Sequence, residues 1–233
     1  MAAVDYLMVI DLETTGLTIH GEKDHPYNAR EAQIVEIAAA PIIVKYKKRK
    51  IEKVLHTKKV APDNYATVPF TYTALVKVRA EDWSSSAETI HNISLETIQK
   101  HGLTLTSMLN QFVEYWRAVE ERVGRRLLPA SYTPFDIQIL NRDFIQHSMV
   151  VPPMPYDPKD FVDLQQVIQA YGALVGIPRM RTLQAYAKRL DLLGETKTQT
   201  HRAMDDVELT VQVLARLLER LGGGGAWHQR KLF

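Results

Sequence analysis

A short apolar run that ends in two acidic residues constrains this chain more than any other feature. Residues 4–16 read Val-Asp-Tyr-Leu-Met-Val-Ile-Asp-Leu-Glu-Thr-Thr-Gly, and such a run is typical of a central strand covered on both faces. Because side chains alternate along a strand, Asp11 and Glu13 project from the same side where it leaves the sheet. Two adjacent carboxylates repel each other unless a hard cation such as Mg²⁺ lies between them. The segment therefore predicts either a cation site or an exposed turn formed by Thr-Thr-Gly.

The composition narrows the class of protein. Of 233 residues, 45% are hydrophobic and 24% charged, which are ordinary values for a globular chain. The absence of cysteine excludes disulfides, a thiolate nucleophile and a cysteine zinc site. We expect no membrane span, because no run of about 18 apolar residues occurs, and an intracellular location, cytoplasmic or nuclear. The net charge of +2 permits a polyanionic partner without requiring one.

The remaining patterns predict strands followed mostly by helices. Strands are expected at residues 34–44, 51–60 and 125–131, and Pro41 indicates a bulge or an edge position late in the first of these. Helices are expected at residues 93–101, 107–123, 134–147, 164–171, 183–190 and 203–221. This order favours an α/β fold in which helices pack on the faces of a mixed central β-sheet.

One domain accounts for nearly the whole chain. We assign it to residues 1–221, with an insertion at residues 62–86 that includes a hairpin through residues 74–78. Residues 222–233 begin with four glycines and are predicted to form a flexible tail.

A third acid, Asp136, follows the predicted strand at residues 125–131. It lies three residues after Thr133, with Pro134 between them, so it fits a helix capping box. A carboxylate at that helix start can also reach a cation held at the end of the first strand. The two roles are compatible.

The last helix supplies the other candidates. His201 precedes it, and Asp206 lies near its buried edge, about 100° around the helix from the core residue Val207. The alternative is that Asp205 and Asp206 only complement the helix dipole. A histidine beside a metal carboxylate is, however, suited to deprotonating a water nucleophile near pH 7.

Taken together and in this order, these residues form a known pattern. The Asp-Leu-Glu-Thr-Thr-Gly strand, Asp136, and the His-x-x-x-x-Asp arrangement of His201 and Asp206 resemble the DEDDh exonucleases of the ribonuclease H-like (DnaQ-like) superfamily. Within that group, residues 93–98 and 171–206 resemble the Eri-type 3′→5′ exoribonucleases. The chain departs from those relatives at Phe135, where they tend to carry tryptophan.

The resemblance implies a function and a set of site residues. It implies 3′→5′ hydrolysis of single-stranded RNA by two Mg²⁺ ions, for which Mn²⁺ can substitute, with release of nucleoside 5′-monophosphates. Asp11, Glu13 and Asp206 would ligate metal, Asp136 would assist, and His201 would be the general base. The substrate residues that it suggests are Leu12, Thr14, Thr15, Gly16, Ile93, Leu95 and Phe135.

Two alternatives remain open at the level of sequence. One is a DEDDh exonuclease that acts on DNA or on very short oligonucleotides, because discrimination depends on contacts to the 2′-OH. The other is a non-catalytic nucleic-acid-binding module, which would be expected to lack one of the four acids or the histidine.

Overall fold

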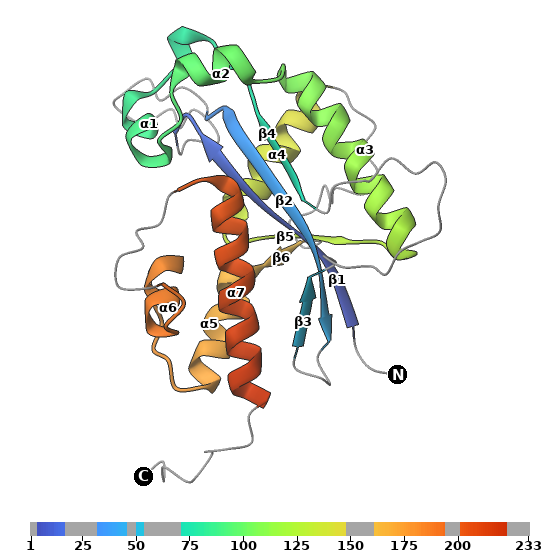
Figure 1. Ribbon diagram of the computed structural model, residues 1–233, viewed down its shortest axis with the longest axis vertical. Coiled ribbons are helices and arrows are strands. Elements are labelled where there is room, and N and C mark those ends of the chain that lie inside the picture. The colour runs from blue at the N-terminus through green and yellow to red at the C-terminus, as the bar shows by residue number, and fades with distance from the viewer. Residues whose placement is uncertain are drawn as a thin grey trace.

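The central sheet is built around β1 (Val4–Thr14), as the apolar pattern predicts. The computed structural model describes residues 4–16, 32–45, 50–53, 71–147, 161–193 and 201–222. Within these residues, six strands form one sheet in the order β3-β2-β1-β5-β6, and β4 also pairs with β2 (Figure 1). The further strands are β2 (Ile34–Lys45), β3 (Lys50–Lys53), β4 (Tyr72–Leu75), β5 (Leu128–Ser131) and β6 (Val162–Asp163).

The sheet is mixed, as predicted. β1 and β2 pair antiparallel along almost their whole length, whereas β1, β5 and β6 run parallel. Parallel strands end at the same edge of a sheet, so the carboxyl ends of β1, β5 and β6 lie together. This shared edge holds Asp11 and Glu13, near the end of β1, and Asp136, which follows β5.

Helices cover both faces of the sheet. Figure 1 shows α5, α6 and α7 on one side and α3 and α4 on the other. The helices are α1 (Ser85–His91), α2 (Leu95–His101), α3 (Leu105–Val123), α4 (Pro134–Gln146), α5 (Leu164–Leu174), α6 (Leu183–Arg189) and α7 (Ala203–Gly222).

Alternate residues of β1 enter different hydrophobic cores. Leu7 and Val9 pack with residues of α5, α6 and α7. Met8, Ile10 and Leu12 pack with residues of α3 and α4. This alternation is the burial on both faces that the apolar run predicted.

Pro41 lies where β2 changes partners. On the side of β2 away from β1, β4 pairs with residues 36–39 and β3 with residues 42–45. Ala40 and Pro41 fall between these two ladders. Pro41 therefore occupies an edge-like position within a central strand, which a residue without an N–H tolerates.

Several predicted elements need correction. The hairpin predicted at residues 74–78 is wrong, because β4 pairs with β2 instead. The helix predicted at residues 164–171 does not stop at Gly172 but runs to Leu174. A Cβ added to Gly172 would lie 3.2 Å from the Tyr186 ring, so this glycine permits close packing rather than ending the helix. The sequence patterns did not predict α1, β6 or the short 3-10 helix Ala80–Asp82.

Other predictions fall partly outside the described residues. Of the predicted strand at residues 51–60, only the part within β3 is described, and residues 54–70, which include the start of the insertion at 62–86, are not described. The predicted tail from residue 223 onwards is not described either. No helix in the described part of the chain is long and apolar enough to cross a membrane.

Candidate active site

The two acids of β1 point toward α7. In the alternation of β1, Asp11 and Glu13 share the face of Leu7 and Val9, which packs against α7. The N-terminal end of α7 lies over this edge of the sheet (Figure 1). The strand period and the helix position together bring residues from the two ends of the chain to one place.

Three carboxylates converge there. Asp11, Glu13 and Asp206 each offer an oxygen within 4.8 Å of the others. Asp206 is buried, with 8% of its surface exposed, as its predicted place on the helix requires. The structure therefore brings together residues that the sequence places nearly a full chain length apart.

His201 lies beside this cluster. Its Nδ1 is 4.0 Å from Oδ2 of Asp206, and 45% of its side chain is exposed. The residue has a positive φ of 47°, a left-handed conformation that is uncommon outside glycine. The turn before α7 thus holds the imidazole at the rim of the acidic cluster, open to solvent.

Asp136 approaches the cluster from the opposite face. It is buried at the first turn of α4, where its Oδ1 accepts the Leu12 N–H at 3.3 Å. The Thr133 hydroxyl donates to its Oδ2 at 3.3 Å, and no side-chain hydrogen bond from Thr133 caps the helix backbone. Asp136 is therefore tied to β1 next to Asp11 and Glu13, although it lies outside the group of three carboxylates.

Burial and mutual repulsion disfavour the charged forms of these acids. Burial is the largest cause that raises the pKa of Asp11 well above its usual range, followed by Asp136 and Asp206. Burial first, and then Asp206 and Glu36, raise the pKa of Glu13 to about 8. Burial raises the pKa of Asp136 to about 7, although the Leu12 N–H opposes the shift. A bound cation would reverse these effects by stabilising the ionised forms.

The donor set fits a hard divalent cation. Mg²⁺ takes oxygen ligands and is commonly held by one or two carboxylates together with water and substrate phosphates. Within the described part of the chain, the group of Asp11, Glu13 and Asp206 offers only oxygens, and the His201 imidazole lies beside Asp206 at the exposed edge. The residues present therefore fit Mg²⁺ or Mn²⁺ better than a soft metal.

Two residues of this site, Glu36 and Arg202, were not predicted from the sequence. Glu36 lies directly opposite Glu13 in the β1–β2 ladder and has 4% of its surface exposed. The Arg202 guanidinium donates two hydrogen bonds to the Glu36 carboxylate, from Nε at 3.0 Å and from Nη2 at 2.6 Å. Glu36 also accepts the Ala203 N–H at 3.0 Å and so caps α7. The available signal was an acid in the otherwise apolar stretch Ile-Val-Glu-Ile-Ala.

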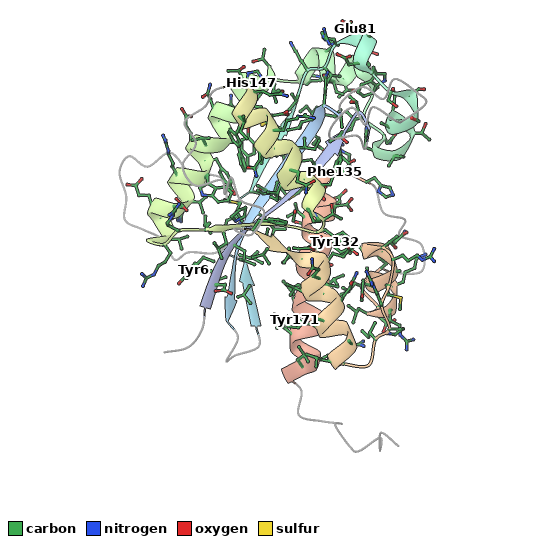
Figure 2. The ribbon with its side chains drawn as sticks, turned by 180° about the vertical axis from the view of Figure 1, so that it is seen from behind. Tyr6, Glu81, Tyr132, Phe135, His147 and Tyr171 are labelled. Carbon is green, nitrogen blue, oxygen red and sulfur yellow. The ribbon has the colours of Figure 1, made fainter. Side chains whose placement is uncertain are left out.

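The predicted substrate residues lie in different surroundings. The Leu12 and Ile93 side chains belong to hydrophobic cores, and Leu95 packs against the same core as Ile93. Figure 2 marks Phe135, which is partly buried, at the first turn of α4. Gly16 is partly exposed.

The two threonines in this set make hydrogen bonds at the end of β1, where Thr15 links the strand to Gln33. Thr15 donates its N–H to the Gln33 carbonyl and accepts the Gln33 N–H on its hydroxyl, at 3.0 and 3.1 Å. The Thr14 hydroxyl donates to the Gly16 carbonyl at 2.5 Å. These bonds shape the turn after β1.

The sequence signature of a known family matches this chain. The RNase T family, described as "Exonuclease", matches residues 86–214, which include Asp136, His201 and Asp206. The chain belongs to this exonuclease family. It is therefore an exonuclease, and it has the ribonuclease H-like fold that the sequence pattern predicted. No curated protein matches the sequence.

Solved structures share the fold at low sequence identity. Cell-death related nuclease 4 (CRN-4) aligns at a TM-score of 0.63 and 15% identity, over 92% of this chain and 64% of that one. The nuclease domain of 3′hExo, a DEDDh family member bound to rAMP, aligns at a TM-score of 0.60 and 16% identity, over 92% of each chain. The zinc-bound E. coli ExoI–ssDNA complex aligns at 0.58 and 13%, over 94% of this chain and 41% of that one. The likeness confirms the predicted mixed α/β fold.

Proposed function

We propose that this exonuclease removes nucleotides one at a time from the 3′ end of single-stranded RNA and depends on two Mg²⁺ ions. The convergence of Asp11, Glu13 and Asp206 within 4.8 Å carries the proposal. Burial and repulsion raise the pKa of Asp11 and of Glu13, so this arrangement is favourable only when protons or cations share it. Oxygen ligands and a required positive charge match a divalent ion.

Each acid has a part in holding the metal. Asp11, Glu13 and Asp206 are the proposed direct ligands, and Asp136, tied to the Leu12 N–H, assists from the other side. When bound, two divalent ions stabilise the attacking and leaving oxygens of an in-line displacement at phosphorus. The acids position these ions at the edge of the sheet, where a nucleic-acid end can reach them.

His201 is the proposed general base. It takes a proton from the water molecule whose oxygen attacks the last phosphodiester, and the bond from phosphorus to the 3′ oxygen of the preceding nucleotide breaks. The phosphate leaves with the terminal nucleoside as a 5′-monophosphate, and the released 3′ oxygen of the shortened strand takes up a proton from solvent to give a 3′-OH. The exposed position of the imidazole at the rim of the cluster suits this proton transfer.

Arg202 and Glu36 hold the base and the acids in place. Arg202 follows His201 directly, and its guanidinium is fixed to β2 beside Glu13. Glu36 also holds the first turn of α7, which carries Asp206. A partner that orients metal-site groups in this way typically contributes 10- to 100-fold in affinity or activity.

The choice of RNA rests on the coverage of similar structures. The 3′hExo nuclease domain, solved with rAMP, aligns over 92% of both chains. A 3′-exonuclease solved in 3′-end recognition of a histone mRNA stem-loop aligns over 84% of its length. The ExoI–ssDNA complex aligns over only 41%. These proportions, with the Eri-type sequence resemblance, favour RNA over DNA.

One assay tests the proposal. Single-stranded RNA and DNA of identical sequence, labelled at the 5′ end, are incubated with Mg²⁺ or with EDTA, and released products are identified by chromatography. We expect a descending ladder and nucleoside 5′-monophosphates from RNA with Mg²⁺ and no cleavage with EDTA. If DNA were degraded faster than RNA, DNA would be the preferred substrate and the proposal of RNA would be wrong. Internal cuts on a strand with a blocked 3′ end would rule out exonuclease action.

A further inference from the structure

A basic cavity lies along the start of α5, the helix that follows β6, and β6 pairs with the strand β5 that precedes Asp136. It has a volume of about 410 Å³ and is lined by Gln165, Gln169, Arg179, Met180 and Arg181. The two glutamines stand one helical turn apart at the start of α5, and the other residues belong to the segment between α5 and α6. The lining thus combines two guanidinium groups with two amides, all of which can donate hydrogen bonds.

The segment that carries the arginines is anchored. The Met180 N–H donates to the Tyr186 hydroxyl at 3.2 Å, and Tyr186 is fully buried. The Ile177 N–H donates to the Gly172 carbonyl at 2.8 Å, and Thr182 caps α6. The backbone on which Arg179 and Arg181 stand is therefore held from both sides, so that a ligand meets a preformed surface.

Both arginine side chains are available for a ligand. Arg179 and Arg181 are exposed. Among the described residues, neither makes an ion pair with an acid. Asp163, at the end of β6, accepts two hydrogen bonds from Gln166 and so caps α5. The cavity therefore retains its positive charge.

A short path joins this cavity to the acidic site. The Gln165 N–H donates to the Tyr132 carbonyl at 3.0 Å. Tyr132 immediately precedes the turn that leads to Asp136, and Figure 2 shows it between the start of α4 and α5. β5 and β6 end side by side at this edge. A strand whose 3′ end lies at Asp136 can thus continue across Tyr132 to the first two turns of α5.

We propose that the cavity binds phosphates of the substrate strand upstream of the bond that is cut. This inference rests on the proposed function and gives it a site for the body of the polyanion. The carboxylate cluster repels every phosphate that is not shared with a metal ion, so the rest of the strand needs a basic surface. Guanidinium groups form bidentate hydrogen bonds to phosphate oxygens, and the amides add neutral donors.

The test compares two double variants with equal charge change. The first is Arg179→Ala with Arg181→Ala. The control is Arg125→Ala with Arg126→Ala; these two exposed residues precede β5, at the opposite edge of the sheet. All four side chains are exposed, and thermal melting verifies that both variants are folded.

Binding is measured first, by fluorescence anisotropy of a labelled single-stranded 12-mer in EDTA, so that the result is independent of catalysis. We expect the cavity variant to bind about tenfold more weakly for each arginine that is lost. This factor corresponds to the lower end of the range of net free energies for hydrogen bonds to a charged group. The dependence of log Kd on log salt should become shallower by about 0.7 per lost phosphate contact. Unchanged affinity and salt slope, or an equal effect of the control variant, would overturn the inference.

Activity is measured next, on the 12-mer and on a nitrophenyl ester of a nucleoside 5′-monophosphate, which has no upstream phosphate. The cavity variant should raise KM for the 12-mer and leave the rate on the ester unchanged. A fall in the ester rate would show that the arginines act at the reacting bond, which also overturns the inference. Wild-type protein that binds the 12-mer through the cavity but cleaves neither substrate would contradict the proposed function alone.

Discussion

The buried Glu36 and the partly exposed pair Asp11 and Glu13 lie on neighbouring strands beneath the start of α7, and the protein compensates their charges differently. Glu36 receives two hydrogen bonds from Arg202 and one from the Ala203 N–H. Asp11 and Glu13, on the next strand, face other carboxylates, and burial and this repulsion raise the pKa of each. Where the chain supplies the counter-charge, the acid fastens a helix to the sheet. Where it does not, the acid is suited to an external cation.

Replacing an uncompensated acid gives the largest expected effect. Asp11→Asn should lower kcat by about 10³-fold or more, because a bound metal contributes several kcal/mol to the transition state. In EDTA, the melting temperature should stay the same or rise, because repulsion has been relieved. Steady-state kinetics and thermal melting measure the two results. The matched control is Glu114→Gln on the exposed side of α3. A variant that melts well below the wild type would show that Asp11 is structural.

Removing the base should have the next largest effect. His201→Ala should reduce kcat by about 10²–10⁴-fold, the usual contribution of general acid–base catalysis. Its affinity for Mg²⁺, measured by calorimetry, should change little, since the three carboxylates remain. A near wild-type rate would remove His201 from the mechanism.

Breaking the compensated pair should affect both activity and stability. Arg202→Ala leaves the Glu36 carboxylate buried with fewer partners, so the melting temperature should fall, opposite to the effect of Asp11→Asn. We expect kcat to fall by about 10- to 100-fold with KM nearly unchanged. Arg202→Lys should have a higher kcat than Arg202→Ala, because lysine returns the positive charge but not the two parallel hydrogen bonds to Glu36.

A control variant on α7 shows whether the effect comes from the position of Arg202 or only from the loss of one positive charge. Arg216→Ala removes an arginine whose Nη1 lies 3.8 Å from Glu219 on α7. It should leave kcat unchanged. If Arg202→Ala lowers stability but not the rate per folded molecule, the pair serves only the fold.

The smallest expected effect is a pH dependence of the metal-free protein. The folded state holds a proton on Glu13 up to a pKa of about 8 and on Asp136 up to about 7, whereas an unfolded carboxyl group loses it near pH 4. Between these values the folded state binds more protons, so stability falls as pH rises. We expect the melting temperature in EDTA to drop by a few degrees between pH 5 and pH 8.

Adding Mg²⁺ tests the cause of that pH dependence. Excess Mg²⁺ should raise the melting temperature most at pH 8, since metal binding displaces the shared protons. The same experiment on Asp11→Asn should show a weaker response to both pH and metal. An equal pH response of variant and wild type would show that other groups are responsible.

The sequence predicted much of this arrangement because its signals are local. The period of two in β1 places Asp11 and Glu13 on one side, and the helical period of α7 places Asp206 at a buried edge. Both placements agree with the structure, although the metal-binding roles stay predictions. The mixed sheet and the amphipathic helices were predictable for the same reason.

What the sequence did not reveal depends on contacts between distant segments. Glu36 and Arg202 are 166 residues apart, and no local sequence pattern around either residue predicts that they pair. Gly172 has the sequence signature of a helix stop, but it packs against Tyr186 and the helix continues. The short helix α1 and the two-residue strand β6 are stabilised by tertiary packing, since elements of this length have little stability alone.

The ion pair between Arg202 and Glu36 has a consequence for the synthesis of the protein on the ribosome. Because its two ends are 166 residues apart, it forms only after the last helix has emerged. At usual rates of synthesis, about 10–30 s pass between the appearance of Glu36 and that of Arg202. During that time Asp11 and Glu13 lack Asp206 and His201. A growing chain therefore carries no complete nuclease centre until residues 201–206 have emerged.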